Sequence, residues 1–257
     1  MTRTCQQAFN LDQEHSPGFK ETCRQIISEM AEIYHVDINS WVTMSNHVHL
    51  ALSVRKPERN AADIQSRYER LQDHLKDPKP WRDWYVKKYY KRFTDLSWYM
   101  WEVNLRMAKA YNRLHKTSGH FWGGRFKSKV LEDEAALLRV MTYIEQNPVK
   151  AGMCEVPSDF PDCSAGWAKL ELENDEAAIP KIPAVGPFKR VEGRERAMRY
   201  VAWMDYQTRV IIGGEFNVQP PAEIATLILP EDQIEVWRKD FEEGRPTDWR
   251  PESCQPR

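Results

Sequence analysis

The stretch VDINSWVTMSNHVHLALSV, residues 36–54, decides the predicted fold. Apolar and polar residues alternate on both sides of Ser45-Asn46, a pair that suits a tight turn. In the first half the apolar residues predicted to share one face are Val36, Ile38, Val42 and Met44. The pattern predicts two strands, 36–44 and 47–54, that pair as an antiparallel hairpin.

The second strand carries two histidines, His47 and His49. Alternate residues of a strand point to one face, so both imidazoles should leave the face opposite Val48, Leu50 and Leu52. Two adjacent imidazoles can hold a divalent metal ion and leave positions open for a substrate. Two surface histidines on a half-exposed strand are the simpler interpretation, and the spacing alone does not decide between them.

Helical periodicity surrounds the hairpin. Apolar residues recur every three or four positions over residues 19–34, which predicts an amphipathic helix. Asp133 can cap a helix that runs to about Asn147, where Pro148 should end it. Further helices are predicted over 61–76, 95–116 and 193–209. The elements together predict an α+β fold.

The helix after Asp133 carries a second candidate pair, Tyr143 and Asn147. Residues four apart share one helix face. A phenol there can act as a nucleophile, and the amide oxygen can be a further metal ligand. A tyrosine with its ring half in the core is the simpler interpretation of the same spacing.

The formal net charge of −1 hides a strong asymmetry. Residues 79–129 carry 13 Lys/Arg and 3 Asp/Glu, whereas residues 130–257 carry 15 and 24. The basic stretch is also rich in aromatic residues. Basic groups neutralise phosphates and exposed aromatics stack on unpaired bases, so we expect a polyanion surface, although burial is the simpler expectation for any single aromatic.

The end of that stretch, GHFWGGRFKSK (residues 119–129), is the third candidate. It is predicted to be a glycine-punctuated loop or a short strand. As a strand it would present Arg125, Lys127 and Lys129 on one side. A structural turn that carries basic side chains on its surface is the simpler interpretation.

Composition excludes several classes of protein. Charged residues make up 29 % of the chain and hydrophobic residues 41 %, which rules out global disorder. No window approaches the length of a membrane span, and the N-terminus has no signal-peptide pattern. Five cysteines without a CxxC argue against a disulfide framework. We expect a cytoplasmic protein without membrane contact.

Three strings occur in a recognisable order: MSNHVHLALSV (44–54), FWGGRFKS (121–128) and YIEQNPVKAG (143–152). Over roughly residues 3–168 the chain resembles the HUH single-tyrosine transposases of the REP-associated tyrosine transposase type. The resemblance implies a ferredoxin-like α+β domain with an antiparallel sheet flanked by helices. It also implies action on single-stranded DNA beside a hairpin, through a 5′-phosphotyrosine.

By the same resemblance, Tyr143 matches the nucleophile, and His47, His49 and Asn147 match the ligands of Mg²⁺ or Mn²⁺. Trp122, Arg125, Lys127 and Lys129 are the candidate DNA-binding residues. Family members differ in whether the tyrosine serves its own subunit, so a monomer and a homodimer both stay open.

The resemblance suggests three segments: a nuclease domain over 1–170, a linker over 171–190 and a C-terminal extension over 191–257. Relatives carry a longer first strand than this chain has before Arg3, so we expect a shortened strand that perturbs the surroundings of the histidines. A catalytically decayed or domesticated DNA-binding protein is therefore the main alternative. A zinc hydrolase lacks support because HExxH is absent. A replication initiator or relaxase would share the histidines but not the other two strings.

Overall fold

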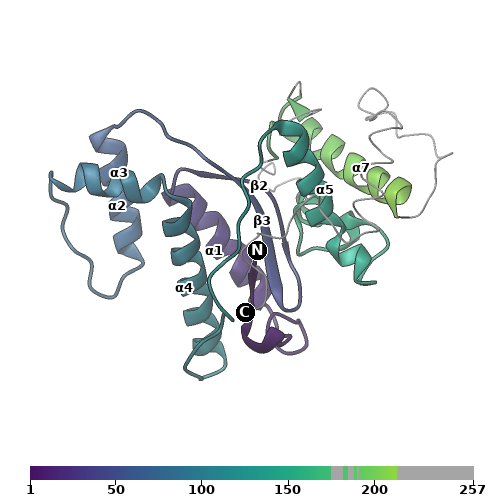
Figure 1. Cartoon of the computed structure of the whole chain (residues 1–257), viewed down its shortest axis with the longest axis horizontal. Coiled ribbons are helices and arrows are strands. Elements are labelled where there is room, and N and C mark those ends of the chain that lie inside the picture. Colours follow the sequence, from purple (N-terminus) through teal and green to yellow (C-terminus); the bar gives the residue numbers. More distant parts are fainter. Residues whose placement is uncertain (175–181, 185–187, 190, 213–257) are drawn as a thin grey trace, which may run out of the picture.

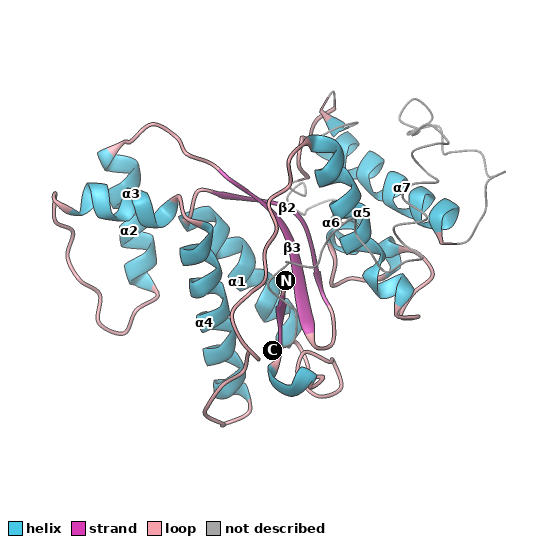
Figure 2. Ribbon diagram, viewed as in Figure 1, coloured by secondary structure: helices cyan, strands magenta, loops and turns pink. Residues whose placement is uncertain are grey.

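The computed structural model describes residues 1–174, 182–184, 188–189 and 191–212, and within them it has an α+β fold. A small antiparallel sheet of three strands, in the order β1–β3–β2, stands at the centre (Figure 2). The strands are β1 (Thr2–Arg3), β2 (Val36–Thr43) and β3 (His47–Val54). The pairing of Thr43 with Val48 and of Val36 with Val54 confirms the predicted hairpin.

One expectation about β2 is wrong. The pairing register shifts between Ile38 and Ser40, so the strand has a bulge at Asn39. One extra residue reverses the alternation, because side chains change face at every position of a strand. Val36 and Ile38 pack in one hydrophobic core, and Val42 and Met44 in another, so the four residues do not share a face.

Helices cover both faces of the sheet (Figure 1). On one face lie α1 (Phe19–Ile33), α2 (Ala61–Asp73), α3 (Tyr85–Phe93) and α4 (Leu96–Leu114). On the other lie α5 (Glu134–Lys150), α6 (Ser164–Glu173) and α7 (Gly193–Ile211). Short 3₁₀ turns occupy Cys5–Gln7 and Pro157–Asp159. In the described ranges no helix combines the length and apolar character that crossing a membrane requires.

The predicted helices are present, with four differences. The α2 helix ends at Asp73, and neither α3 nor α6 was predicted. The fourth difference is that α5 continues through Pro148 to Lys150. Pro148 has no N–H for the carbonyl of Ile144, but the side-chain amide of Asn147 donates to that oxygen at 3.3 Å. The helix therefore continues past the proline.

Helix α7 lies within the segment expected to be a separate extension, yet it packs directly on α5 and α6. Its Tyr200 and Trp203 are fully buried in the same core as Met141 and Ile144 of α5. The segment expected to be a linker begins inside α6, which ends at Glu173. The rest of the expected extension, 213–257, lies outside the described residues.

The segment 121–127 runs beside β1 on the side away from β3. The N–H of Cys5 donates to Phe121, that of Gly123 to Arg3 and that of Lys127 to Met1, at 2.8–2.9 Å. A Cβ on Gly123 would lie 3.0 Å from the carbonyl oxygen of Thr4, so glycine favours this close approach. The segment forms an irregular edge next to the sheet.

Candidate functional site

The two histidines of β3 lie on the sheet face that α5 covers. Val48 packs in the opposite core, as the alternation predicts, and Leu50 and Leu52 pack against it. The rings of His47 and His49 are nearly perpendicular, with centroids 4.8 Å apart. His47 is half-buried and His49 is buried. The strand geometry therefore brings both imidazoles to one place.

Both imidazoles are neutral at physiological pH. Burial lowers the pKa of His47 to about 4, and the positive charges of Arg3 and the N-terminus add to this effect. Burial also lowers the pKa of His49. Nδ1 of His47 lies 2.6 Å from Oδ1 of Asn46, and this contact orients the ring. A neutral imidazole oriented through one nitrogen is the form that binds a metal ion.

Tyr143 reaches this pair from α5. Its ring is nearly perpendicular to that of His49, with centroids 6.1 Å apart. The structure thus brings together three of the predicted site residues from segments far apart in the sequence. Burial raises the pKa of Tyr143, and the nearby charge of Arg3 partly offsets this by lowering it. The phenol is protonated at neutral pH.

Asn147 lies one turn beyond Tyr143, but its amide nitrogen is already engaged. It donates to the carbonyl of Tyr143 at 2.7 Å and to that of Ile144 at 3.3 Å. These bonds orient the side chain along α5. No cluster of three or more His, Cys, Asp or Glu side chains that could hold a metal occurs in the described residues. A metal at His47 and His49 would thus need further ligands, such as water or substrate oxygens.

Two basic groups near the histidines, the Arg3 guanidinium and the α-amino group, were missed at the sequence level. Arg3 is the cross-strand partner of His47 in the β1–β3 pairing, and such partners lie on one face. The α-amino group of Met1 donates to the carbonyl of Lys127, and burial lowers its pKa to about 6. The pairing of β1 with β3 could not be known from residues 1–4 alone, because a two-residue strand has no periodicity.

The candidate DNA-binding residues of segment 121–129 have different environments. Trp122 is half-buried, and its indole nitrogen donates to the carbonyl of Asn104 at 2.8 Å, so it anchors the segment to α4. Arg125, Lys127 and Lys129 are exposed. The backbone of Lys127 is bonded to Met1 in both directions, which places this basic segment beside the strand that carries Arg3.

A buried polar network fixes α5 from its other side. The carboxylate of Glu145 accepts hydrogen bonds from Ser40 at 2.8 Å, from Tyr200 at 2.6 Å and from the N–H of Ala165 at 3.1 Å. Burial raises the pKa of Glu145, and these donors partly lower it. The network joins β2, α6 and α7 to the helix that carries Tyr143.

Comparison with known proteins gives no assignment. No protein-family model, no curated protein and no solved structure matches the chain. The chemistry of the site therefore has to be argued from its own geometry. A phenol, two neutral imidazoles and an arginine that meet beside a basic surface are suited to nucleophilic attack on a phosphodiester.

Proposed function

We propose that the protein is a metal-dependent endonuclease or transposase of the HUH single-tyrosine type, which cleaves and rejoins single-stranded DNA at or near hairpins. The observation that carries this proposal is the meeting of Tyr143 with His49 and His47. None of the three positions is informative alone, but a phenol from a distant helix beside two paired imidazoles is what the proposed reaction needs.

The strand arrangement supports a ferredoxin-like domain. In chain order the elements are β1, α1, β2, β3, α4 and the 121–127 segment, once the α2–α3 pair is set aside. That order is the β-α-β-β-α-β pattern of this fold. Segment 121–127 forms backbone hydrogen bonds beside β1, the position that a fourth strand takes in this fold, although the sheet itself has three strands.

The two imidazoles fit Mg²⁺ or Mn²⁺ only in part. They are neutral and oriented, as ligation requires, but hard divalent ions prefer oxygen ligands and keep several waters. The oxygens of Asn147 and of the DNA phosphate would complete the set. When bound, the ion would polarise the scissile phosphate and stabilise the charge that develops on its oxygens.

The residues of the chain perform the remaining steps. Tyr143 Oη attacks the phosphorus, a new O–P bond forms, and the bond from phosphorus to the 3′ oxygen breaks. The phenol proton passes to solvent water, and the departing oxygen takes a proton to become a 3′-OH. Arg3 neutralises charge on the phosphate. Reversal by another 3′-OH rejoins DNA without ATP, since phosphotyrosine retains the energy of the broken bond.

The test is adduct formation with the full chain. A hairpin oligonucleotide labelled on the side 3′ to the cut should give a protein–DNA band that survives denaturant in Mg²⁺ or Mn²⁺ and disappears with EDTA. Tyr143→Phe should bind the DNA and give no adduct, because only the attacking oxygen is lost. Tyr90→Phe, a half-buried tyrosine in the other core, is the matched control. Adduct formation by Tyr143→Phe would contradict the proposal.

A DNA-binding protein without catalysis is the second candidate. It is favoured by one observation, the hydrogen bonds of Asn147 to its own helix, which give that side chain a structural role beside Pro148. Tight hairpin binding by the wild type without an adduct in either metal would select this candidate.

A further inference from the structure

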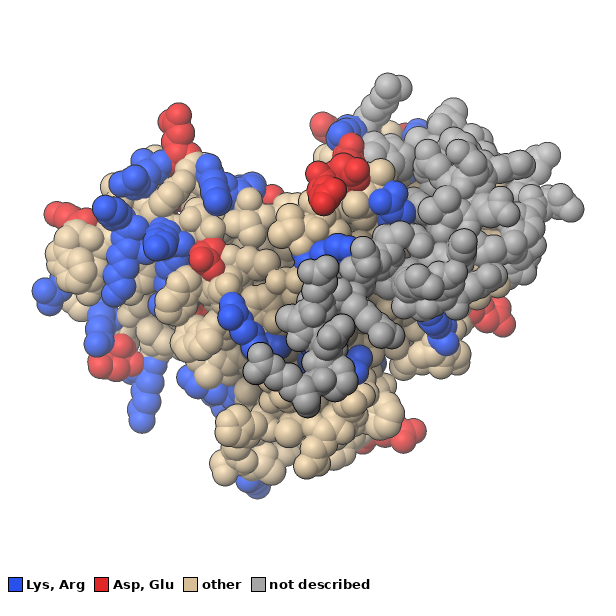
Figure 3. All heavy atoms as spheres, in the orientation of Figure 1, with Lys and Arg blue, Asp and Glu red and all other residues tan. Residues whose placement is uncertain are grey.

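A groove of about 740 Å³ lies between the α2–α3 pair and α4, on the sheet face opposite the histidines. Figure 3 shows Lys and Arg side chains gathered over the α2–α3 side of the molecule. The cations that line the groove are Lys79, Lys88, Arg92, Arg106, Lys109 and Arg113. The acidic residues that line it are Glu29, Asp77 and Glu102. The lining is therefore cationic overall.

Two of these cations share one internal carboxylate. Arg92 and Arg106 each lie 2.9 Å from the buried carboxylate of Glu102. The other four, Lys79, Lys88, Lys109 and Arg113, are exposed and form no ion pair within the described part of the chain. They stand on both walls of the groove, from α3 and the loop before it and from α4.

Exposed tryptophans stand at the same place. Trp98 and Trp101 of α4 are 44 % and 51 % exposed, and their ring centroids are 5.7 Å apart. The guanidinium of Arg92 lies 4.7 Å from the Trp98 ring. Burial is the ordinary expectation for an indole, and it does not hold here. Exposed indoles near a cationic groove match the way that single-stranded DNA is bound.

The basic segment next to the histidine site contacts the start of α4. Nη2 of Arg125 lies 3.4 Å from Oγ of Ser97, directly before Trp98 at the start of α4. The basic segment and the exposed tryptophans therefore meet at the start of α4.

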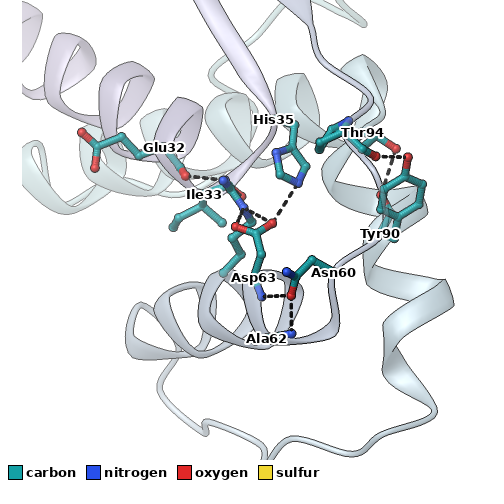
Figure 4. A network of polar contacts seen from close by, with 10 residues as sticks. Glu32, Ile33, His35, Asn60, Ala62, Asp63, Tyr90 and Thr94 are labelled. Atoms are coloured by element: carbon teal, nitrogen blue, oxygen red, sulfur yellow. Dashed lines mark hydrogen bonds and ion pairs between the residues drawn. The ribbon is translucent and has the colours of Figure 1, made fainter.

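The outer wall of the groove is held in place by a polar network (Figure 4). Asn60 caps α2 through the N–H groups of Ala62 and Asp63. Asp63 lies 3.4 Å from His35, and Arg67 donates from α2 to the carbonyl of Ile33 at the end of α1. The groove is thus formed before any ligand binds, which reduces the ordering cost of binding.

We propose that this groove, with Trp98 and Trp101, binds the unpaired arm of the DNA substrate by stacking and phosphate neutralisation. The inference rests on the proposed function for the identity of the ligand, but it needs no catalysis. It assigns a second DNA-binding surface, distinct from the 121–129 segment.

The test is the affinity of the full chain for a labelled 20-nucleotide oligo(dT), measured by fluorescence anisotropy at several salt concentrations. Lys88→Glu with Lys109→Glu should weaken binding by about tenfold or more and flatten the salt dependence. Lys87→Glu with Lys116→Glu makes the same charge change outside the groove lining and should cost less than about threefold. Equal losses in the two double variants would overturn the inference.

A second pair of variants tests stacking without any change of charge. Trp101→Ala should weaken oligo(dT) binding about tenfold. Trp84 does not line the groove, and its side chain is more exposed than that of Trp101, 65 % against 51 %. Trp84→Ala should therefore leave the affinity for oligo(dT) unchanged. Loss of affinity by Trp84→Ala alone, or displacement of oligo(dT) by a glutamate 20-mer at equal concentration, would overturn the inference. Circular dichroism confirms that each variant is folded.

The outcomes separate this inference from the proposed function. If the groove variants lose oligo(dT) binding while no adduct ever forms at Tyr143, the groove stands and the proposed chemistry fails. If wild type forms the adduct on a hairpin and the groove variants bind oligo(dT) like wild type, the chemistry stands and the groove is wrong.

Discussion

The two faces of the sheet differ in what they carry. The face under α5 holds His47, His49 and Tyr143, and behind them a buried polar network around Glu145. The face under α1 and α4 holds an aromatic core, and its outer surface carries the cationic groove. The first face holds polar side chains in a fixed arrangement, and the outer surface on the second side carries exposed cations.

This difference follows from one strand. Successive residues of β3 point to opposite faces, so His47 and His49 go to one side and Val48 to the other. The basic stretch 79–129 contains α3 and α4, which lie on the side of the sheet opposite the histidines. It ends in the 121–127 segment, which runs beside β1. The face that carries the histidines and the basic segment meet at this edge of the sheet.

The largest effect is expected from the histidines. His47→Ala and His49→Ala should each reduce adduct formation by about a thousandfold or more, because the metal that stabilises phosphate charge loses a ligand. Binding of the same DNA should stay within about threefold of wild type, since the basic surface is intact. His120→Ala, an exposed histidine beside the basic segment, is the control. Adduct formation by both histidine variants at the wild-type rate would contradict the role proposed for the face that carries the histidines.

The next effect concerns the network behind Tyr143. Tyr200→Phe removes a hydrogen bond to the buried carboxylate of Glu145 and should lower the free energy of unfolding by about 1.5–3 kcal/mol. Glu145→Ala, which leaves several buried donors without an acceptor, should cost about 3–5 kcal/mol. Urea denaturation measures both. Tyr206→Phe, in the same core, should cost less than either variant; an equal cost would show that the hydrogen bond is unimportant.

A moderate effect is expected from the basic segment. Replacing Arg125, Lys127 and Lys129 together with alanine should weaken binding of all single-stranded oligonucleotides alike, because phosphate contacts carry no sequence information. The slope of log K against log salt should become shallower by about 0.7 for each phosphate that the protein no longer neutralises. Lys56→Ala, an exposed lysine outside this segment, is the control. Weaker binding of one sequence only would contradict the assigned role.

The smallest effect tests the edge where the faces meet. Gly123→Ala would place a Cβ 3.0 Å from the carbonyl oxygen of Thr4 and should lower the free energy of unfolding by about 1 kcal/mol. Gly124→Ala meets no atom within 4 Å and should be close to neutral. If the two alanine variants unfold at the same urea concentration, segment 121–127 does not pack against the N-terminal strand as described.

Much of the site could be predicted from local patterns. The hairpin and the shared face of His47 and His49 follow from alternation, and the helix that carries Tyr143 follows from its cap and period. The bulge at Asn39 could not be predicted, because one inserted residue leaves the composition of the strand unchanged. At Pro148, α5 continues with a hydrogen bond from the Asn147 side chain to the carbonyl of Ile144, and helix propensities do not include such a bond.

The contacts between segments that are distant in the sequence also could not be predicted. Arg3 enters the site only because β1 pairs with β3, and Tyr200 only because α7 packs on α5. Both contacts join residues that are far apart along the chain, and nothing in the local sequence specifies such a partner. The exposure of Trp98 and Trp101 was also missed, since amphipathic spacing does not tell which indoles the neighbouring helices cover.

The central claim is that Tyr143 is the nucleophile, and locating the attached nucleotide tests it most directly. Wild-type protein is incubated with the hairpin oligonucleotide and Mn²⁺, the DNA is digested to a short remnant, and the protein is cleaved with trypsin. Mass spectrometry should find the remnant on the peptide VMTYIEQNPVK, residues 140–150, at Tyr143. A remnant on any other tyrosine, or an adduct-free protein that still binds the hairpin tightly, would contradict the account.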